Sequence, residues 1–187
     1  ASCRGFAGGG VHALESQQAL ASVEQALSGV PFRQVARTVK LFVQGLCGAD
    51  VAVTALPDSV ISTTRATVSA DGGTISLPAL LRRYPTAAEN ERLYLMMAAH
   101  EAGHLEFGTY RLRLESLIDL IERVRDRYGR SLSTRPETLA ALFQLYPRPS
   151  LARDLWTVLE DARVEYLLQD EYPGMRSDLA RLAAESI

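Results

Sequence analysis

The chain has 187 residues, of which 47% are hydrophobic and 22% are charged, and its formal net charge is -2 at pH 7. This composition is typical of an ordinary globular protein that can bury a sizeable core, and the near-neutral balance gives no reason to expect a nucleic-acid partner. The chain contains no run of 18 or more apolar residues. We therefore expect no membrane span.

Cysteine usage indicates the compartment. Cys3 and Cys47 are too few for a disulfide framework and lack the spacing of a zinc knuckle. We expect two free thiols in a reducing, cytoplasmic environment.

The first residues predict a flexible N-terminus over 1–10, ending in three consecutive glycines. The start carries neither an initiator methionine nor a signal-peptide pattern, so we expect the sequence to be a piece of a longer protein. His12 follows, and since nothing near it has ligand spacing we interpret it as a surface residue.

Residues 11–50 predict an N-terminal pair of helices. Apolar residues with helical spacing favour a first amphipathic helix over 13–27. Pro31 opens a second helix, which ends at Gly45 or Gly48.

From residue 51 to residue 77 the pattern changes to β-branched runs bounded by turn formers, which predicts a small antiparallel sheet. The turn Asp71-Gly72-Gly73 predicts a β-hairpin over 64–77. A short helix is expected over 79–84, before Pro85.

A helix of about 87–107 carries the motif His100-Glu101-Ala102-Gly103-His104. Two histidines four residues apart lie on one helical face and can bind one ion, while Glu101 lies within reach of the attacking water as a general base. The motif predicts a Zn²⁺ site. Chance is the alternative, but the chain has only three histidines and two fall in this frame. Gly103 costs a helix about 1 kcal/mol relative to alanine, and a crowded metal site is one candidate for what offsets that cost.

After Gly108 the remaining residues, 109–187, predict helices. Apolar residues from Leu114 to Val124 have helical spacing. Thr134 and Glu137 form a capping-box pattern for the next helix, and Ser150 is the expected cap of the one that follows. The last helix, after a turn at 172–174, reaches Ile187 without a stop signal, and we expect the natural protein to continue.

A zinc ion held by two histidines needs a third protein ligand, commonly a carboxylate on a later helix. Asp161 and Glu165 are four residues apart, which suits one metal ligand and one acid that orients a histidine from behind. Glu160 is the alternative ligand, and it can instead pair with Arg163. An ordinary charged helix face is the remaining interpretation.

The acids lie among apolar neighbours, which favours a site over a solvated face; these neighbours are Leu155, Val158, Leu159 and Ala162. Trp156 and Tyr166 are interpreted as core residues.

The predicted fold class is therefore α+β, a mainly helical zincin-like domain over 51–187 with a small sheet before the motif helix. This is the layout of zinc peptidases, in which an edge strand can hold an extended peptide.

Three segments carry a resemblance to a known family: HEAGHLEFGT at 100–109, LEDARVE at 159–165 and YPGMR at 172–176. They resemble the region that precedes the von Willebrand factor A domain in NorD/CbbO-type proteins, over roughly residues 85–180. The resemblance implies a partner, a MoxR-type AAA+ ATPase, and a role in activating enzymes such as nitric oxide reductase or Rubisco. The von Willebrand domain itself is absent from this sequence, so its function is not carried over.

The motif also resembles gluzincin peptidases, which supply two histidines and a downstream carboxylate. Their usual E-x-x-x-D order is reversed here as Asp161-x-x-x-Glu165. The choice of third ligand therefore stays open.

Two functions follow as hypotheses. The first is a zinc metallopeptidase acting on a peptide or protein substrate, with His100, His104 and Asp161 or Glu160 on the metal and Glu101 as the base. In this hypothesis Glu165 and Arg163 support the ligands. The second is a non-catalytic adaptor that works with a MoxR-type ATPase.

Overall fold

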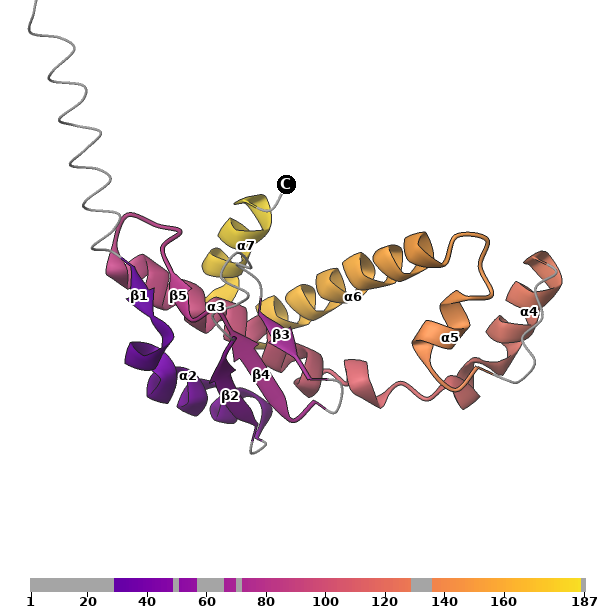
Figure 1. Ribbon diagram of the computed structural model, residues 1–187, viewed down its shortest axis with the longest axis horizontal. Helices are drawn as coiled ribbons and strands as arrows, with labels where there is room; N and C mark the ends of the chain where they lie inside the picture. The colour runs from indigo at the N-terminus through magenta and orange to yellow at the C-terminus, as the bar shows by residue number, and fades with distance from the viewer. Residues whose placement is uncertain (1–28, 49–50, 57–65, 70–71, 129–135, 186–187) are drawn as a thin grey trace, which may run out of the picture. The chain divides into compact units, whose positions relative to one another are not determined.

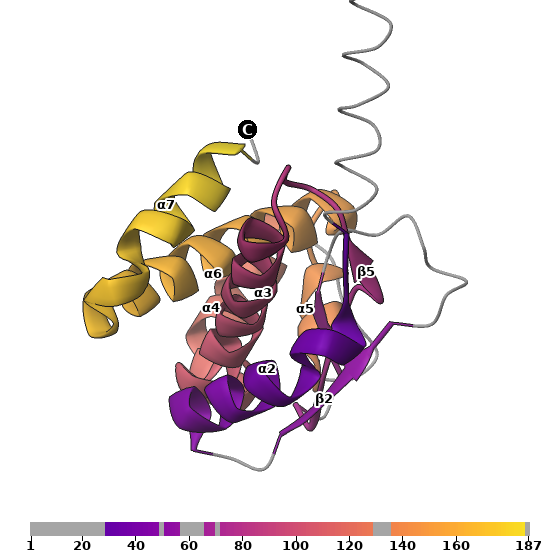
Figure 2. The ribbon, with the colours of Figure 1, turned by 90° about the vertical axis from the view of Figure 1, so that its left-hand side faces the viewer.

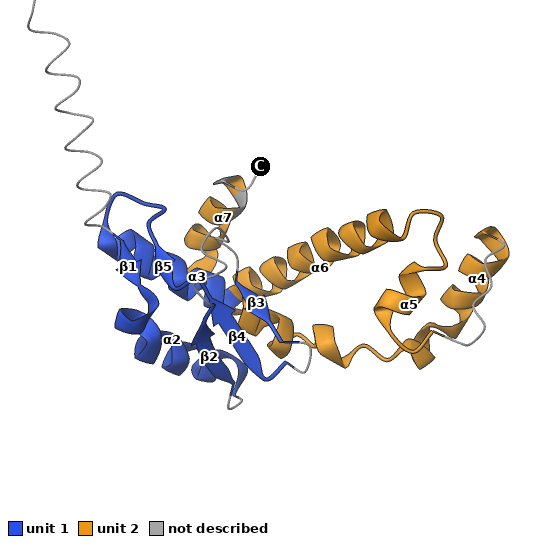
Figure 3. Ribbon diagram, viewed as in Figure 1, with its two compact units in different colours: residues 1–99 blue, residues 100–187 orange. Residues whose placement is uncertain are grey.

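A computed structural model of the protein describes residues 29–48, 51–56, 66–69, 72–128 and 136–185. Two compact units are present, Ala1–Ala99 and His100–Ile187, and the boundary falls within helix α3, Ala87–Glu106 (Figure 3). Both units contain helices and only the first contains described strands, which confirms a mainly helical α+β fold. Among the described residues, none of the helices is long and apolar enough to cross a membrane.

Several predictions fall outside the described residues. They include the flexible N-terminus, the helix over 13–27, and the assignments of Cys3 and His12.

The second predicted helix of the N-terminal region is α2, Phe32–Cys47. Gly48 ends it in the left-handed conformation, with φ 60°, and donates its backbone N–H to the Gln44 carbonyl. Of the two glycines predicted to end this helix, Gly48 is therefore the correct one. Its buried face has helical spacing and consists of Phe32, Val35, Val39 and Val43.

A three-stranded sheet lies beside α2 in the first unit (Figures 1 and 2). Its strand order is β2, Ala52–Ala55, then β4, Thr74–Leu77, then β3, Thr67–Val68. Strands β3 and β4 pair antiparallel, which confirms the predicted hairpin. Strands β2 and β4 pair in parallel, so this sheet is mixed rather than purely antiparallel.

The predicted short helix over 79–84 is wrong. Leu80–Leu81 form strand β5, which pairs antiparallel with β1, Val30–Pro31. Leu81 is buried and Leu80 is exposed, as expected of the alternation along a strand. The Phe32 N–H extends the pairing by donating to the Ala79 carbonyl.

The predicted motif helix is confirmed as α3, Ala87–Glu106. Thr86 and Glu89 bond reciprocally at its start, through the Thr86 hydroxyl. Asn90 is fully buried, and its amide makes four hydrogen bonds to the backbone of the chain that enters the helix.

The second unit is helical, as predicted for residues 109–187. Its elements are η2 (Thr109–Arg111), η3 (Leu114–Leu117), α4 (Ile118–Tyr128), α5 (Leu139–Phe143), α6 (Pro149–Glu171), η4 (Pro173–Met175) and α7 (Arg176–Glu185). A small core lies beside α4 and α5 and includes Leu114, Ile121, Val124, Leu142 and Leu145.

Two predicted helix caps are wrong. Helix α5 begins after Thr138, whose side chain accepts a hydrogen bond from the Ala141 N–H. Of the two residues of the predicted capping box, Glu137 lies before the helix and Thr134 lies outside the described residues. Helix α6 begins at Pro149, whose fixed φ suits the first helical position, so Ser150 is already inside it.

The apolar neighbours of the α6 acids, from which the sequence favoured a site over a solvated face, are themselves exposed. Leu155, Val158 and Leu159 are 55%, 65% and 69% exposed. Tyr166 is exposed as well and is not a core residue, whereas Trp156 is half-buried against Phe143.

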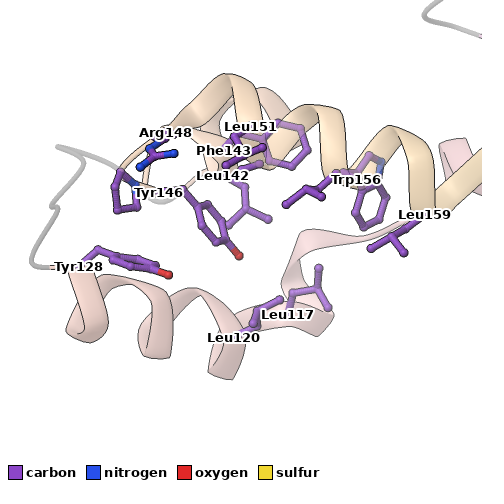
Figure 4. Close-up of a pocket in the computed structure, with 13 residues that line it drawn as sticks. Leu117, Leu120, Tyr128, Leu142, Phe143, Tyr146, Arg148, Leu151, Trp156 and Leu159 are labelled. Atoms are coloured by element: carbon purple, nitrogen blue, oxygen red, sulfur yellow. The ribbon is translucent and has the colours of Figure 1, made fainter.

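Leu155 and Leu159 of α6 border a cavity of about 570 Å³ in the second unit. Figure 4 shows Tyr128, Leu142, Phe143 and Trp156 among the side chains that surround it, with Arg148 at its rim.

Candidate metal centre

The second unit brings three candidate ligands together, His100 and His104 from α3 and Asp161 from α6. The two histidine Nε2 atoms lie 3.2 Å apart. Asp161 Oδ1 lies 3.4 Å from His104 Nε2 and 3.8 Å from His100 Nε2. The three residues form a possible metal-binding triad.

These separations fit one small ion. Around a tetrahedral zinc with bonds of about 2.0–2.1 Å, ligand atoms lie about 3.3 Å from one another. Two imidazole nitrogens and one carboxylate oxygen also form a ligand set that zinc accepts, with a fourth position left for water. The residues present therefore fit a zinc ion in both spacing and chemistry.

Gly103 allows α6 to approach the motif helix. A Cβ built at this glycine would lie 2.7 Å from Val164 Cγ1 and 3.1 Å from Leu168 Cδ1. Val164 and Leu168 are buried and lie three and seven residues after Asp161, on the same side of α6. The absence of a side chain at Gly103 therefore permits close packing against α6, and this packing holds Asp161 beside the histidines.

Charges within the site shift the pKa values of His100 and Asp161 in opposite directions. Burial disfavours the charged form of His100, but the Asp161 carboxylate, whose Oδ1 lies 3.8 Å from His100 Nε2, and the charges of Glu101 and Glu165 raise its pKa above the usual value. Burial also opposes ionisation of Asp161, yet its contacts with His100 and His104 lower its pKa well below the usual range. Before any metal binds, these groups stabilise one another electrostatically.

Glu101, the residue between the ligands, behaves differently. Burial raises its pKa, the two histidines lower it, and Asp161 raises it, with a net increase. Its carboxylate is therefore a stronger base than an exposed glutamate.

Glu165 lies on the Nδ1 side of His100. Its Oε1 atom is 3.8 Å from His100 Nδ1. This distance is longer than a hydrogen bond, so in this structure the interaction is electrostatic.

Glu160, the alternative ligand, faces a different set of partners. Its carboxylate receives two hydrogen bonds from Arg163, of 2.6 and 2.8 Å, and one from the Thr109 hydroxyl. Arg163, first, and Thr109 lower its pKa, although burial opposes them. The carboxylate oxygen that lies with both histidine Nε2 atoms is that of Asp161.

Two residues near the site were missed by the sequence analysis, Thr109 and Tyr110. Gly108 reverses the chain after α3 with a φ of 78°, and Thr109 Oγ1 then lies 3.0 Å from His104 Nδ1. Burial raises the Tyr110 pKa, and the charges of Glu101 and Asp161 raise it further. A glycine directly after a motif helix was the available signal that the chain turns back there.

Comparisons of the chain with protein-family models, with curated proteins and with solved structures found no match. The fold and the triad define the class, a mainly helical α+β protein with a possible metal centre.

Proposed function

We propose that the protein is a zinc-dependent metallopeptidase-like domain that hydrolyses peptide bonds. The observation that carries this proposal is the placement of His100, His104 and Asp161, whose ligand atoms have the spacing of a tetrahedral zinc site. When bound, the ion would polarise the substrate carbonyl and make the attacking water more acidic.

Glu101 is the proposed general base. It follows the first ligand directly, and the charges of both histidines and of Asp161 act on it. A carboxylate with a raised pKa is better matched to proton transfer near neutral pH than an ordinary one. A Glu101 carboxylate oxygen would take a proton from the attacking water and return it to the leaving amine.

Tyr110 is the proposed hydrogen-bond donor for substrate. Like any tyrosine with a pKa of about 10 or above, it is protonated near neutral pH, and the charges that act on it are those of Glu101 and Asp161. A protonated phenol near the base can stabilise negative charge that develops on a carbonyl oxygen.

The first test is the metal content of the purified chain, measured by mass spectrometry after dialysis. We expect about one zinc per chain, since the triad supplies one site, and loss of that zinc in His100→Ala. Failure of the protein to hold zinc, even after zinc is added, would refute the proposal.

The second test is cleavage of a fluorescently labelled unfolded protein by the zinc-loaded chain. Glu101→Gln should retain zinc and lose about 100- to 10,000-fold in rate, the usual contribution of a general base. Glu106→Gln makes the same chemical change at an exposed position of α3 and should leave the rate unchanged. Cleavage that survives Glu101→Gln would rule out this mechanism.

A second candidate function is an adaptor for a MoxR-type AAA+ ATPase. The exposed apolar residues of α6, among them Val158 and Leu159, support it, because apolar patches on a surface commonly mark protein contacts. Binding of the metal-free chain to such an ATPase, lost in Val158→Asp, would favour the adaptor. Absence of binding by the unmodified chain would count against it.

A further inference from the structure

His104 has two ring nitrogens with different surroundings. Its Nε2 faces His100 and Asp161 in the triad, and its Nδ1 lies 3.0 Å from the Thr109 hydroxyl. A neutral imidazole carries one N–H, and only the nitrogen without it can bind a metal. Zinc binding through Nε2 therefore requires the hydrogen to be on Nδ1.

The Thr109 hydroxyl has a single hydrogen, and the structure determines where that hydrogen points. Thr109 Oγ1 lies 2.5 Å from Glu160 Oε1 and donates to it. An ionised carboxylate can only accept hydrogen bonds. The Thr109 oxygen is then left to accept from His104, which places the hydrogen on Nδ1.

The orientation of Glu160 is held in turn by Arg163. The guanidinium donates through Nε to Glu160 Oε2 at 2.8 Å and through NH2 to Glu160 Oε1 at 2.6 Å. The same Arg163 nitrogen donates to the Phe107 carbonyl at 3.2 Å, close to the end of α3. The Glu160 side chain is only 11% exposed, so solvent competes little for these bonds.

We infer that Thr109 and Glu160 are positioning residues, which hold His104 as the Nδ1–H tautomer with its Nε2 lone pair directed at the candidate metal centre. The inference deepens the proposed function and rests on it for the metal. Partners of this kind, placed behind a metal-ligating histidine, typically change metal affinity by about 10- to 100-fold. His100 offers an internal comparison, because its Nδ1 is 3.8 Å from Glu165 and lacks so short a contact with that carboxylate.

The test uses Thr109→Val, which removes the hydroxyl, and Thr109→Ser, which keeps it. The control Thr157→Val makes the same chemical change at an exposed position of α6. The first readout is the pair of imidazole nitrogen chemical shifts of His104 in the metal-free protein, which report the tautomer. The second is zinc affinity, measured by competition with a chromophoric chelator.

We expect the wild-type protein, Thr109→Ser and Thr157→Val to show the Nδ1–H tautomer of His104. Thr109→Val should show a substantial Nε2–H population and bind zinc about 10- to 100-fold more weakly. A folded Thr109→Val protein with an unchanged tautomer and unchanged zinc affinity would overturn the inference.

The outcome is separable from that of the proposed function. A wild-type chain that binds zinc and cleaves no peptide would refute the peptidase and leave the tautomer result standing. A wild-type chain with active cleavage, in which His104 is already the Nε2–H tautomer before metal binds, would refute the inference alone.

Discussion

Replacement of Gly103 by alanine tests the packing that holds α6 against the motif helix. Alanine is favoured over glycine in a helix interior by about 1 kcal/mol, so propensity alone predicts stabilisation. The added Cβ would lie 2.7 Å from Val164 Cγ1, closer than such contacts occur. Val164 is buried and β-branched, with one strongly preferred rotamer in a helix, and cannot turn away without cost.

Overpacking of this kind costs typically about 1–3 kcal/mol, which equals or exceeds the gain in propensity. We expect Gly103→Ala to lower the free energy of unfolding by about 1 kcal/mol, the difference between these two effects. Gly45→Ala is the matched control, because a Cβ there meets nothing within 4 Å. That exposed position in α2 should gain up to about 1 kcal/mol from helix propensity.

Urea unfolding followed by circular dichroism measures both free energies, and the two midpoints should shift in opposite directions. The decisive comparison uses Val164→Ala, which removes the nearest atom that the new Cβ would meet and leaves Leu168 Cδ1 at 3.1 Å. In that background Gly103→Ala should destabilise the protein less than it does in the wild type, a coupling expected of side chains in direct contact. If Gly103→Ala stabilises the wild-type protein as much as Gly45→Ala does, or if Val164→Ala leaves its effect unchanged, the packing argument fails.

Three further predictions concern pH and burial. Zinc affinity should fall as the pH is lowered through the raised pKa of His100, because the metal competes with the proton for the imidazole. The fall should begin above the ordinary imidazole pKa of about 6.5. A zinc affinity that does not change with pH, measured by competition with a chelator, would contradict this prediction. In the metal-free protein, the stability that His100 contributes is fully present below about pH 6.5 and is lost as the pH rises through its raised pKa. The stability that Asp161 contributes is present above about pH 4 and is lost as the pH falls through its lowered pKa. Urea midpoints should therefore show a maximum between these limits that Asp161→Asn removes, and an unchanged profile in that variant would refute the assignment. Asn90→Ala should lower the free energy of unfolding, measured in the same urea assay, by about 3 kcal/mol or more. The reason is that four hydrogen bonds between a fully buried amide and the backbone are lost together. A loss below about 1 kcal/mol would show that water replaces these bonds.

The parts of the fold that sequence reasoning predicted correctly depend on local patterns. Helical spacing and a following glycine located α2, and a turn sequence between β-branched runs located the β3–β4 hairpin. The motif helix was recognisable because its histidines, four residues apart, must share one face.

The errors concern features that depend on distant or alternative partners. Leu80–Leu81 form a strand only because Val30–Pro31, about fifty residues earlier in the chain, pair with them. Thr134 and Thr138 are both acceptable caps by residue type, and local sequence does not decide between them. Helix α6 has apolar residues on more than one side, and which side is buried depends on what packs against it.

In the candidate site, a single pair of residues shows both what local sequence predicts and what depends on distant partners. Glu160 and Asp161 are adjacent carboxylates, and a rotation of about 100° per residue along a helix separates their directions. One step along α6 therefore directs Asp161 to His100 and His104 and Glu160 to Thr109. Spacing alone left the ligand open between them, because the rotation that separates the two carboxylates does not say where the histidines lie. The backbone of Gly108 decides the rest: its left-handed turn brings Thr109 to His104, and Thr109 gives Glu160 a hydrogen-bond partner of its own.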